Sequence, residues 1–289
     1  MKPEDVKKVG VIGCGIMGSG IVEVCARADI TVTYLEATDE LVSGGRQRIE
    51  RSLGKAVERG KLSREDGEAA RGRITGTTDF EALSDADLVI EAVVENLEAK
   101  LEVFRALDRV TREEVILASN TSSIPIVKLG AATSRPDRVI GMHFFNPPPV
   151  MKLIELVRAL TTSDETVEFA RAFAERLGKV TVLSKDRAGF IVNLLLIPYL
   201  NGAVRMLEEG FATAEDIDAA VKLGLSHPMG PLELLDFVGL DTTLFIAEIL
   251  YDEFKIPEYA PPPLLKRMVE AGRLGRKSGR GFYDHTREG

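Results

Sequence analysis

The chain has 289 residues, a formal net charge of −8 and 45% hydrophobic residues. This length accommodates one large domain or two, with substantial hydrophobic cores. The negative charge argues against nucleic acid or an anionic membrane as a partner. The two cysteines, Cys14 and Cys25, are too few for a disulfide framework or a metal cluster. We therefore expect buried thiols, no metal site and a reducing, cytoplasmic compartment.

Neither a signal peptide nor a membrane span is expected. The first residues are charged and lead directly into a predicted strand, which leaves no room for a signal peptide. The longest apolar stretch, residues 189–204, is interrupted by Asn193, Pro198 and Asn201. Such a stretch is too polar to span a bilayer.

A glycine motif follows the first predicted strand: residues 9–18 read VGVIGCGIMG. In such a motif Gly13 allows a tight turn, Gly15 lets the backbone approach a pyrophosphate, and Gly18 lets the next helix pack closely. Free N–H groups at the start of the predicted helix 16–28 would face the anion. The alternative is an ordinary β-turn-α unit in which the glycines occur by chance.

A second β-branched run, residues 30–35, leads directly into Glu36. A carboxylate at this distance from the glycines accepts hydrogen bonds from ribose hydroxyls and repels a 2′-phosphate. Residues 37–39 supply no arginine that would reverse this preference. We therefore expect NAD(H) rather than NADP(H) as the cofactor.

Two regions of the chain differ in pattern. Up to about residue 183, β-branched runs alternate with helical stretches, which predicts a doubly wound, mostly parallel sheet. Beyond it, we expect three helices. The first covers residues 192–209, and the second begins after an N-cap at Thr213. The third runs from Pro231 to about Leu250 and has apolar residues on more than one face. We predict a Rossmann-type α/β domain over residues 1–184 and an all-α domain over residues 185–289. The expected strands are residues 8–12, 31–35, 73–77, 88–92, 115–118, 139–143, 152–157 and 180–183.

An insertion at about residues 38–72 separates the second and third strands, and its pattern predicts a pair of helices. Residues 46–73 contain nine basic and five acidic side chains. Arg48, Arg51, Lys55 and Arg59 recur at helical spacing on one face. Such a face is ordinarily a solvated surface; the alternative is a site for a ligand with several phosphates.

Three histidines are candidates for acid–base chemistry, since histidine is the usual base for the hydroxyl proton of a secondary alcohol. His285 lies near the end of the chain, where we expect it to be exposed, and His227 lies in a connector. His143 ends a strand, where ligands lie in open α/β sheets. Glu155 lies in an apolar strand, and an imidazole partner would remove the cost of burying it. The alternative is a solvent-facing Glu155 on an edge strand.

Further polar side chains follow the fifth strand, where residues 119–123 read SNTSS. Their hydroxyl and amide groups could hold a substrate oxygen or a nicotinamide carboxamide. Ser122 or Ser123 could instead cap the helix that begins near Pro125. Asn193, in an otherwise apolar helix, needs partners, and a substrate carbonyl is one.

The motifs SNTSS, GMHFFNP, GFIVN, SHPMGPLEL and LGRKSGRGFY occur in this order over nearly the whole chain. Together they resemble the 3-hydroxyacyl-CoA dehydrogenase family, in particular its short bacterial 3-hydroxybutyryl-CoA dehydrogenases. The resemblance implies interconversion of (S)-3-hydroxyacyl-CoA and 3-ketoacyl-CoA with NAD, as in β-oxidation or butyrate metabolism. It also implies a homodimer joined through the helical domain.

The resemblance further implies residue roles. His143 would be the general base and Glu155 its orienting partner. Ser122 and Asn193 would hold the reacting oxygen, with Asn146 lining the same pocket. The implied cofactor contacts are Gly13, Gly15, Ile16, Met17, Gly18, Glu36, Glu95, Asn120 and Asn146. The implied contacts to the phosphates of coenzyme A are Ser52, Lys55 and Arg59, which favours a binding role for the basic helix.

Three positions depart from the family pattern. Ala188 and Leu194 stand where Pro and Arg are common, and Glu36 stands where Asp is common. None of these changes removes a catalytic group, and Glu36 retains the carboxylate. Two other hypotheses remain: a relative of the same fold that acts on a carrier-protein thioester or a sugar acid, and a non-catalytic binding or structural protein.

Overall fold

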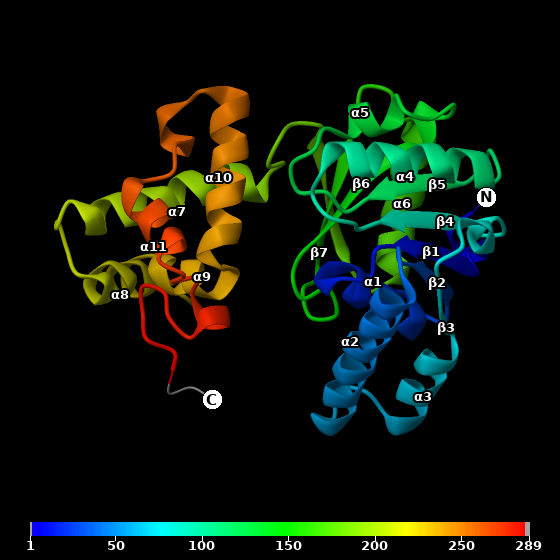
Figure 1. Cartoon of the computed structure of the whole chain (residues 1–289), viewed down its shortest axis with the longest axis horizontal. Coiled ribbons are helices and arrows are strands. Elements are labelled where there is room, and N and C mark those ends of the chain that lie inside the picture. The colour runs from blue at the N-terminus through cyan, green and yellow to red at the C-terminus, as the bar shows by residue number, and fades with distance from the viewer. Residues whose placement is uncertain (1, 287–289) are drawn as a thin grey trace. The chain divides into compact units, whose positions relative to one another are not determined.

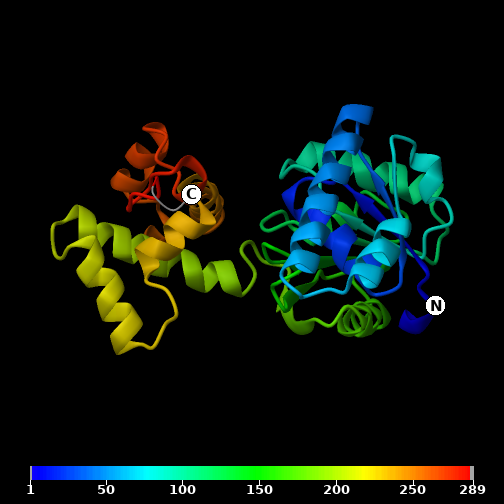
Figure 2. The same cartoon turned by 90° about the horizontal axis from the view of Figure 1, so that it is seen from below.

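The computed structural model describes residues 2–286 and divides into two compact units, Met1–Arg187 and Ala188–Gly289 (Figure 1). The first unit contains a sheet and its covering helices, and the second is built from helices (Figure 2). The predicted combination of a Rossmann-type α/β part and an all-α part is confirmed. No helix among residues 2–286 has the length and apolarity that crossing a membrane requires.

The sheet of the first unit has eight strands in the order β3-β2-β1-β4-β5-β6-β7-β8. Neighbouring strands are parallel except for β6 and β7, which pair antiparallel. Residues 145–152 between β6 and β7 are too few for the crossover that a parallel pair requires. All eight expected strands are present: two have the expected bounds, and the ends of the other six differ by no more than two residues. They are β1 (Lys8–Ile12), β2 (Thr31–Leu35), β3 (Ile74–Thr77), β4 (Leu88–Glu91), β5 (Ile116–Ser119), β6 (Val139–Phe144), β7 (Leu153–Arg158) and β8 (Val180–Lys185).

Helices α1 and α6 cover one face of this sheet. Ile21 and Val22 of α1 and Phe169 and Phe173 of α6 join the strand side chains in one buried apolar cluster. The expected helical pair in the insertion is confirmed: α2 and α3 pack on each other beside β3 (Figure 1). The helices of this unit are α1 (Ile16–Arg27), α2 (Asp39–Glu58), α3 (Arg64–Gly72), α4 (Leu97–Val110), α5 (Ile126–Gly130) and α6 (Asp164–Arg176). Short 3-10 helices span Pro3–Asp5, Phe80–Leu83 and Pro136–Arg138.

The second unit packs its helices around a core that includes Leu200, Leu232 and Leu265. The single helix expected from Pro231 to Leu250 is wrong, because the chain forms two helices separated by Gly239. This glycine has φ 104°, outside the helical region. The helices are α7 (Val192–Glu208), α8 (Ala214–Gly224), α9 (Pro231–Val238), α10 (Leu240–Phe254) and α11 (Pro263–Glu270). Short 3-10 helices span Pro257–Tyr259 and Arg276–Ser278.

The C-terminal tail of the second unit docks on α9 through Asp236. The expectation that His285 is exposed is wrong: its side chain is 10% exposed, and its Nε2 lies 2.8 Å from Asp236 Oδ2. The backbone N–H groups of Phe282 and Tyr283 donate to the same carboxylate. Because Asp236 is buried, its oxygens need donors, and the tail supplies them.

Two glycines of α2 provide a test of how closely this helix packs against Cys14. A Cβ at Gly54 would meet no heavy atom within 4 Å, whereas a Cβ at Gly45 would lie 2.8 Å from Cys14. We expect Gly54→Ala to raise the free energy of unfolding by about 0.5–1 kcal/mol, because alanine is the better helix former. We expect Gly45→Ala to lower it by about 1–3 kcal/mol through overpacking. Urea denaturation measures both, and equal effects would contradict the close approach of α2 to Cys14.

Both cysteine thiols are buried. Burial, reinforced by the Glu36 carboxylate, raises the pKa of Cys14 to about 12, and burial raises the pKa of Cys25 to about 12. Native protein at about pH 8 should therefore resist thiol reagents, and unfolded protein should react at both cysteines. Because the folded thiols hold their protons more tightly, the free energy of unfolding should fall as the pH rises above the ordinary thiol value of 9.0. Rapid native labelling would contradict this burial.

Candidate active site

The glycine motif forms a tight loop between β1 and α1. Gly13 has φ 85°, and its N–H donates to the carbonyl of Leu35 at 2.9 Å. A Cβ at Gly18 would lie 1.8 Å from the Gly13 carbonyl oxygen, so only glycine permits this packing. A Cβ at Gly15, by contrast, would meet no heavy atom within 4 Å. The open space beside Gly15, at the start of α1, is where the phosphates of a dinucleotide would fit.

This loop borders a cavity of about 490 Å³ at the ends of β1, β2 and β4. Gly13, Gly15 and Glu36 are among its lining residues, together with apolar side chains such as Leu41 and Val94. The structure therefore brings the glycines and the carboxylate of the motif to one hollow. Its lining fits an adenosine, with a carboxylate available for ribose hydroxyls. Ile16 is exposed beside this loop and Met17 is partly buried.

Glu36 and Arg48 bind the backbone of one residue of the glycine loop, Cys14, at its N–H and at its carbonyl group. Glu36 Oε1 accepts from the Cys14 N–H at 2.5 Å. Arg48 donates to the Cys14 carbonyl oxygen through Nε at 3.1 Å and through Nη2 at 3.0 Å. Arg48 also lines the cavity, a position that sequence reasoning missed when it grouped this residue with the other basic residues of α2. The glycine at position 45, against Cys14, was the available signal that α2 approaches the loop.

The antiparallel pairing of β6 and β7 places His143 directly opposite Glu155. His143 Nδ1 lies 2.8 Å from Glu155 Oε2, and both side chains are buried. The alternative of a solvent-facing Glu155 on an edge strand is wrong, because β8 pairs with the other edge of β7. Since a carboxylate only accepts, Nδ1 carries the proton and Nε2 of the neutral ring is an acceptor.

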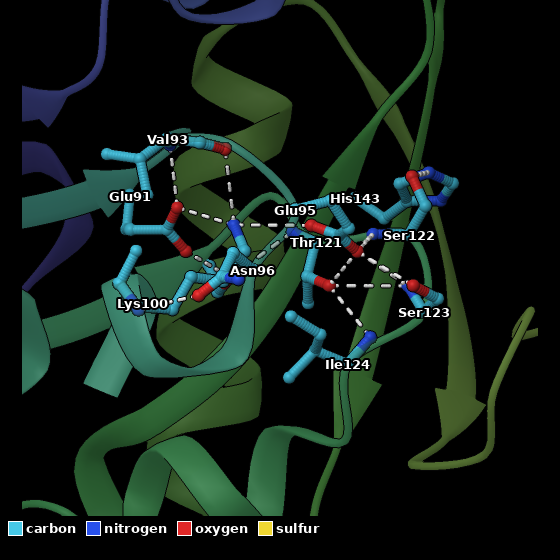
Figure 3. Close-up of polar contacts among 12 residues, drawn as sticks. Glu91, Val93, Glu95, Asn96, Lys100, Thr121, Ser122, Ser123, Ile124 and His143 are labelled. Atoms are coloured by element: carbon cyan, nitrogen blue, oxygen red, sulfur yellow. Dashed lines mark hydrogen bonds and ion pairs between the residues drawn. The ribbon is translucent and has the colours of Figure 1, made fainter. Parts of the chain in front are cut away.

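Ser122 completes a chain of contacts on the other side of this ring (Figure 3). Its Oγ lies 3.1 Å from His143 Nε2. Ser122, His143 and Glu155 therefore form one hydrogen-bonded series that ends in a buried carboxylate. The Phe145 ring lies against the imidazole, with 4.7 Å between the ring centroids.

The hydrogen bonds around α5 correct the capping alternative for Ser122 and Ser123. The carboxylate of Asp186 accepts from the N–H groups of Ile126 and Val127, both at 2.8 Å. The helix start is thus satisfied by a distant aspartate, which leaves Ser122 available to His143. Sequence reasoning missed Asp186 because the contact is not local.

The remaining predicted residues lie in several surroundings. Asn120 Oδ1 accepts from the Phe144 N–H at 2.9 Å and so ties the ends of β5 and β6 together beside His143. Asn146 is exposed in the loop after β6. Asn193 is on α7 in the second unit, so its relation to His143 stays a prediction. Ser52 is half-buried, and Lys55 and Arg59 are exposed at the C-terminal end of α2.

Sequence reasoning also missed a buried lysine near these side chains. Lys100, in the first turn of α4, is buried and forms ion pairs with Glu91 and Glu95. A lysine at this point was an available signal, because the first turn of a helix favours acidic side chains.

Comparison with known proteins identifies relatives along the whole chain. Residues 8–187 match the NAD binding domain of 3-hydroxyacyl-CoA dehydrogenase, and residues 189–285 match its C-terminal domain. A 3-hydroxybutyryl-CoA dehydrogenase of Mycobacterium tuberculosis is 56% identical over 97% of this chain and 99% of its own length.

Solved structures agree with these matches. M. tuberculosis FadB2 has a TM-score of 0.95 and 56% identity, covering 96% of this chain and 99% of its own. The (S)-3-hydroxybutyryl-CoA dehydrogenase PaaH1 from Ralstonia eutropha has a TM-score of 0.92 and 46% identity, covering 97% and 99%. The chain belongs to the 3-hydroxyacyl-CoA dehydrogenase family.

Proposed function

We propose that this protein interconverts (S)-3-hydroxyacyl-CoA and 3-ketoacyl-CoA with NAD(H), with 3-hydroxybutyryl-CoA and acetoacetyl-CoA as the preferred pair. The observation that carries the proposal is the series Ser122–His143–Glu155, with contacts of 3.1 and 2.8 Å, at the strand ends of a dinucleotide-binding fold. The names of the most similar relatives support the choice of a four-carbon acyl group.

In the oxidation direction, His143 Nε2 removes the proton of the 3-hydroxyl group. Bound NAD would accept the hydride from the carbon that bears this hydroxyl group. Glu155 keeps the proton on Nδ1 and stabilises the imidazolium once Nε2 is protonated. Because Ser122 Oγ already lies beside Nε2, a substrate hydroxyl at this point would contact both groups. We assign Asn193 to the same oxygen through the family resemblance, with Asn146 lining the pocket.

NAD(H) is the proposed cofactor because Glu36 lines the cavity at the place where an adenosine ribose would lie. Arg48 lines the same cavity but is held by the Cys14 carbonyl. The glycine loop would hold the pyrophosphate, with Asn120 and Glu95 nearer the nicotinamide end. Ile16 and Met17 would border the cofactor at the start of α1.

Ser52, Lys55 and Arg59 are the proposed contacts to the phosphates of coenzyme A. Lys55 and Arg59 are exposed near the end of α2, where two positive charges could meet a polyanionic ligand. A homodimer through the helical unit, in the cytoplasm, completes the proposal.

The first experiment follows NADH oxidation with acetoacetyl-CoA, with NADPH and the pantetheine-truncated thioester as controls. We expect turnover with NADH that falls sharply on truncation. Lys55→Ala with Arg59→Ala should raise KM for acetoacetyl-CoA about tenfold with little change in kcat, as expected for two exposed ion pairs. Lys61→Ala with Arg64→Ala removes the same charge from nearby exposed positions and should leave KM unchanged.

Each result decides between the hypotheses. Equal turnover of both thioesters would retain the enzyme and reject the coenzyme A site. No turnover with either thioester would reject the proposed substrate and favour a carrier-protein thioester or a non-catalytic role.

The role of His143 has its own test. His143→Gln should lower kcat by about 10²–10⁴-fold, because the general base is lost. Its affinity for NADH, measured by fluorescence titration, should stay close to that of the wild type. Turnover at the wild-type rate would contradict the assignment of His143.

A further inference from the structure

The proposed function places Glu95 near the nicotinamide but does not explain the buried group of charges to which Glu95 belongs (Figure 3). Lys100 Nζ lies 2.6 Å from Glu91 Oε1 and 3.3 Å from Glu95 Oε2. Glu91 and Lys100 are almost completely buried, and Glu95 is partly buried. Two carboxylates and one ammonium group carry a net negative charge, which is costly at such a place unless further donors satisfy the oxygens.

Those donors come from the SNTSS loop after β5. Glu95 Oε1 accepts from Thr121 Oγ1 at 2.5 Å, from the Ser122 N–H at 3.0 Å and from the Ser123 N–H at 3.1 Å. Ser123 Oγ donates to the same oxygen at 2.9 Å. Thr121 Oγ1 in turn accepts from the N–H groups of Ser123 and Ile124. The loop is therefore folded around one carboxylate oxygen.

The carboxylate at the centre of this loop is held in its ionised form. Burial by itself raises the pKa of Glu95, but the charge of Lys100 and the donors of Thr121, Ser123 and Ser122 outweigh it and lower the pKa below the ordinary value. Glu95 is consequently ionised, and an acceptor, at neutral pH.

Lys100 fixes Glu95 relative to the sheet. Glu91 ends β4 and accepts from Ser119 Oγ of β5 at 2.6 Å, so its position is set by two adjacent strands. Lys100 joins this carboxylate to Glu95. The Ser122 peptide is thus tied to the sheet that also carries His143.

We propose that Glu95, anchored by Lys100, is a positioning residue that sets Ser122 Oγ against His143 Nε2. It acts on the reaction through Ser122 rather than through contact with the substrate. The kinetic part of this inference rests on the proposed function, whereas the placement of Ser122 does not.

A double-mutant cycle tests the proposal. Glu95→Gln keeps the size of the side chain and removes its charge, and it is compared in the wild-type and Ser122→Ala backgrounds. We expect Glu95→Gln to lower kcat about 10²-fold in the wild type, the loss typical of a misplaced group. In the Ser122→Ala background the same change should alter kcat less than about threefold. Glu98→Gln, at an exposed position of α4, which begins two residues after Glu95, is the matched control and should leave kcat unchanged.

Two results would overturn the proposal. Equal losses in both backgrounds would mean that Glu95 acts independently of Ser122. A loss confined to NADH affinity would mean that Glu95 serves only the cofactor and does not position Ser122.

A second experiment measures the surroundings of His143 instead of activity. It uses variants of Thr121, so it remains possible if the Glu95→Gln protein fails to fold. The chain has three histidines, so the imidazole NMR signal of His143 can be assigned with His143→Gln. Thr121→Val removes the hydroxyl that bridges Glu95 and the loop, and Thr121→Ser retains it. We expect Thr121→Val to move the His143 signal in the same direction as Ser122→Ala does, and Thr121→Ser to leave it in place.

This readout separates the two proposals. A His143 signal that is unmoved by Thr121→Val would overturn the positioning role, whatever the activity. An inactive wild type in which the His143 signal still responds would overturn the proposed function alone.

Discussion

His143 and Glu155 face each other because β6 and β7 run antiparallel in a sheet whose other neighbouring strands are parallel. Residues directly opposite in an antiparallel pair have side chains on the same face and within contact distance. Glu155 is buried, and a buried carboxylate without a donor would be costly. The imidazole supplies that donor and is oriented by it, so one strand pairing fixes both the position and the tautomer of the ring.

Carboxylates hold other segments of the first unit as well. Glu95 accepts from the loop after β5, Asp186 accepts from the start of α5, and Glu36 accepts from the glycine loop. In each case the acceptor is distant in the chain from the N–H groups that it satisfies. Backbone groups that would otherwise need local caps are therefore used to fasten separate segments together.

Helix α2 carries two kinds of basic side chain. Arg48 turns toward the glycine loop and binds the Cys14 carbonyl, in a place that Gly45 opens by its lack of a side chain. Lys55 and Arg59, about two and about three turns further along, are exposed. The basic face predicted from helical spacing is thus divided between support of the nucleotide cavity and an accessible charged surface.

The sequence by itself determined the eight strands, the helical pair in the insertion, the glycine loop and the change to helices near residue 185. These features depend on local periodicity and on short motifs, which are complete within a few residues. The family was likewise evident from motifs in order along the chain.

Tertiary structure alone decided how distant side chains meet. It selected Asp186 rather than Ser122 or Ser123 to cap α5, across 60 and 59 positions of the chain. It also brought His285 into contact with Asp236, 49 positions away, and Arg48 into contact with the Cys14 carbonyl oxygen. A buried polar atom needs a hydrogen-bond partner, and tertiary packing decides which residue supplies it. The neighbouring residues in the sequence do not identify that partner.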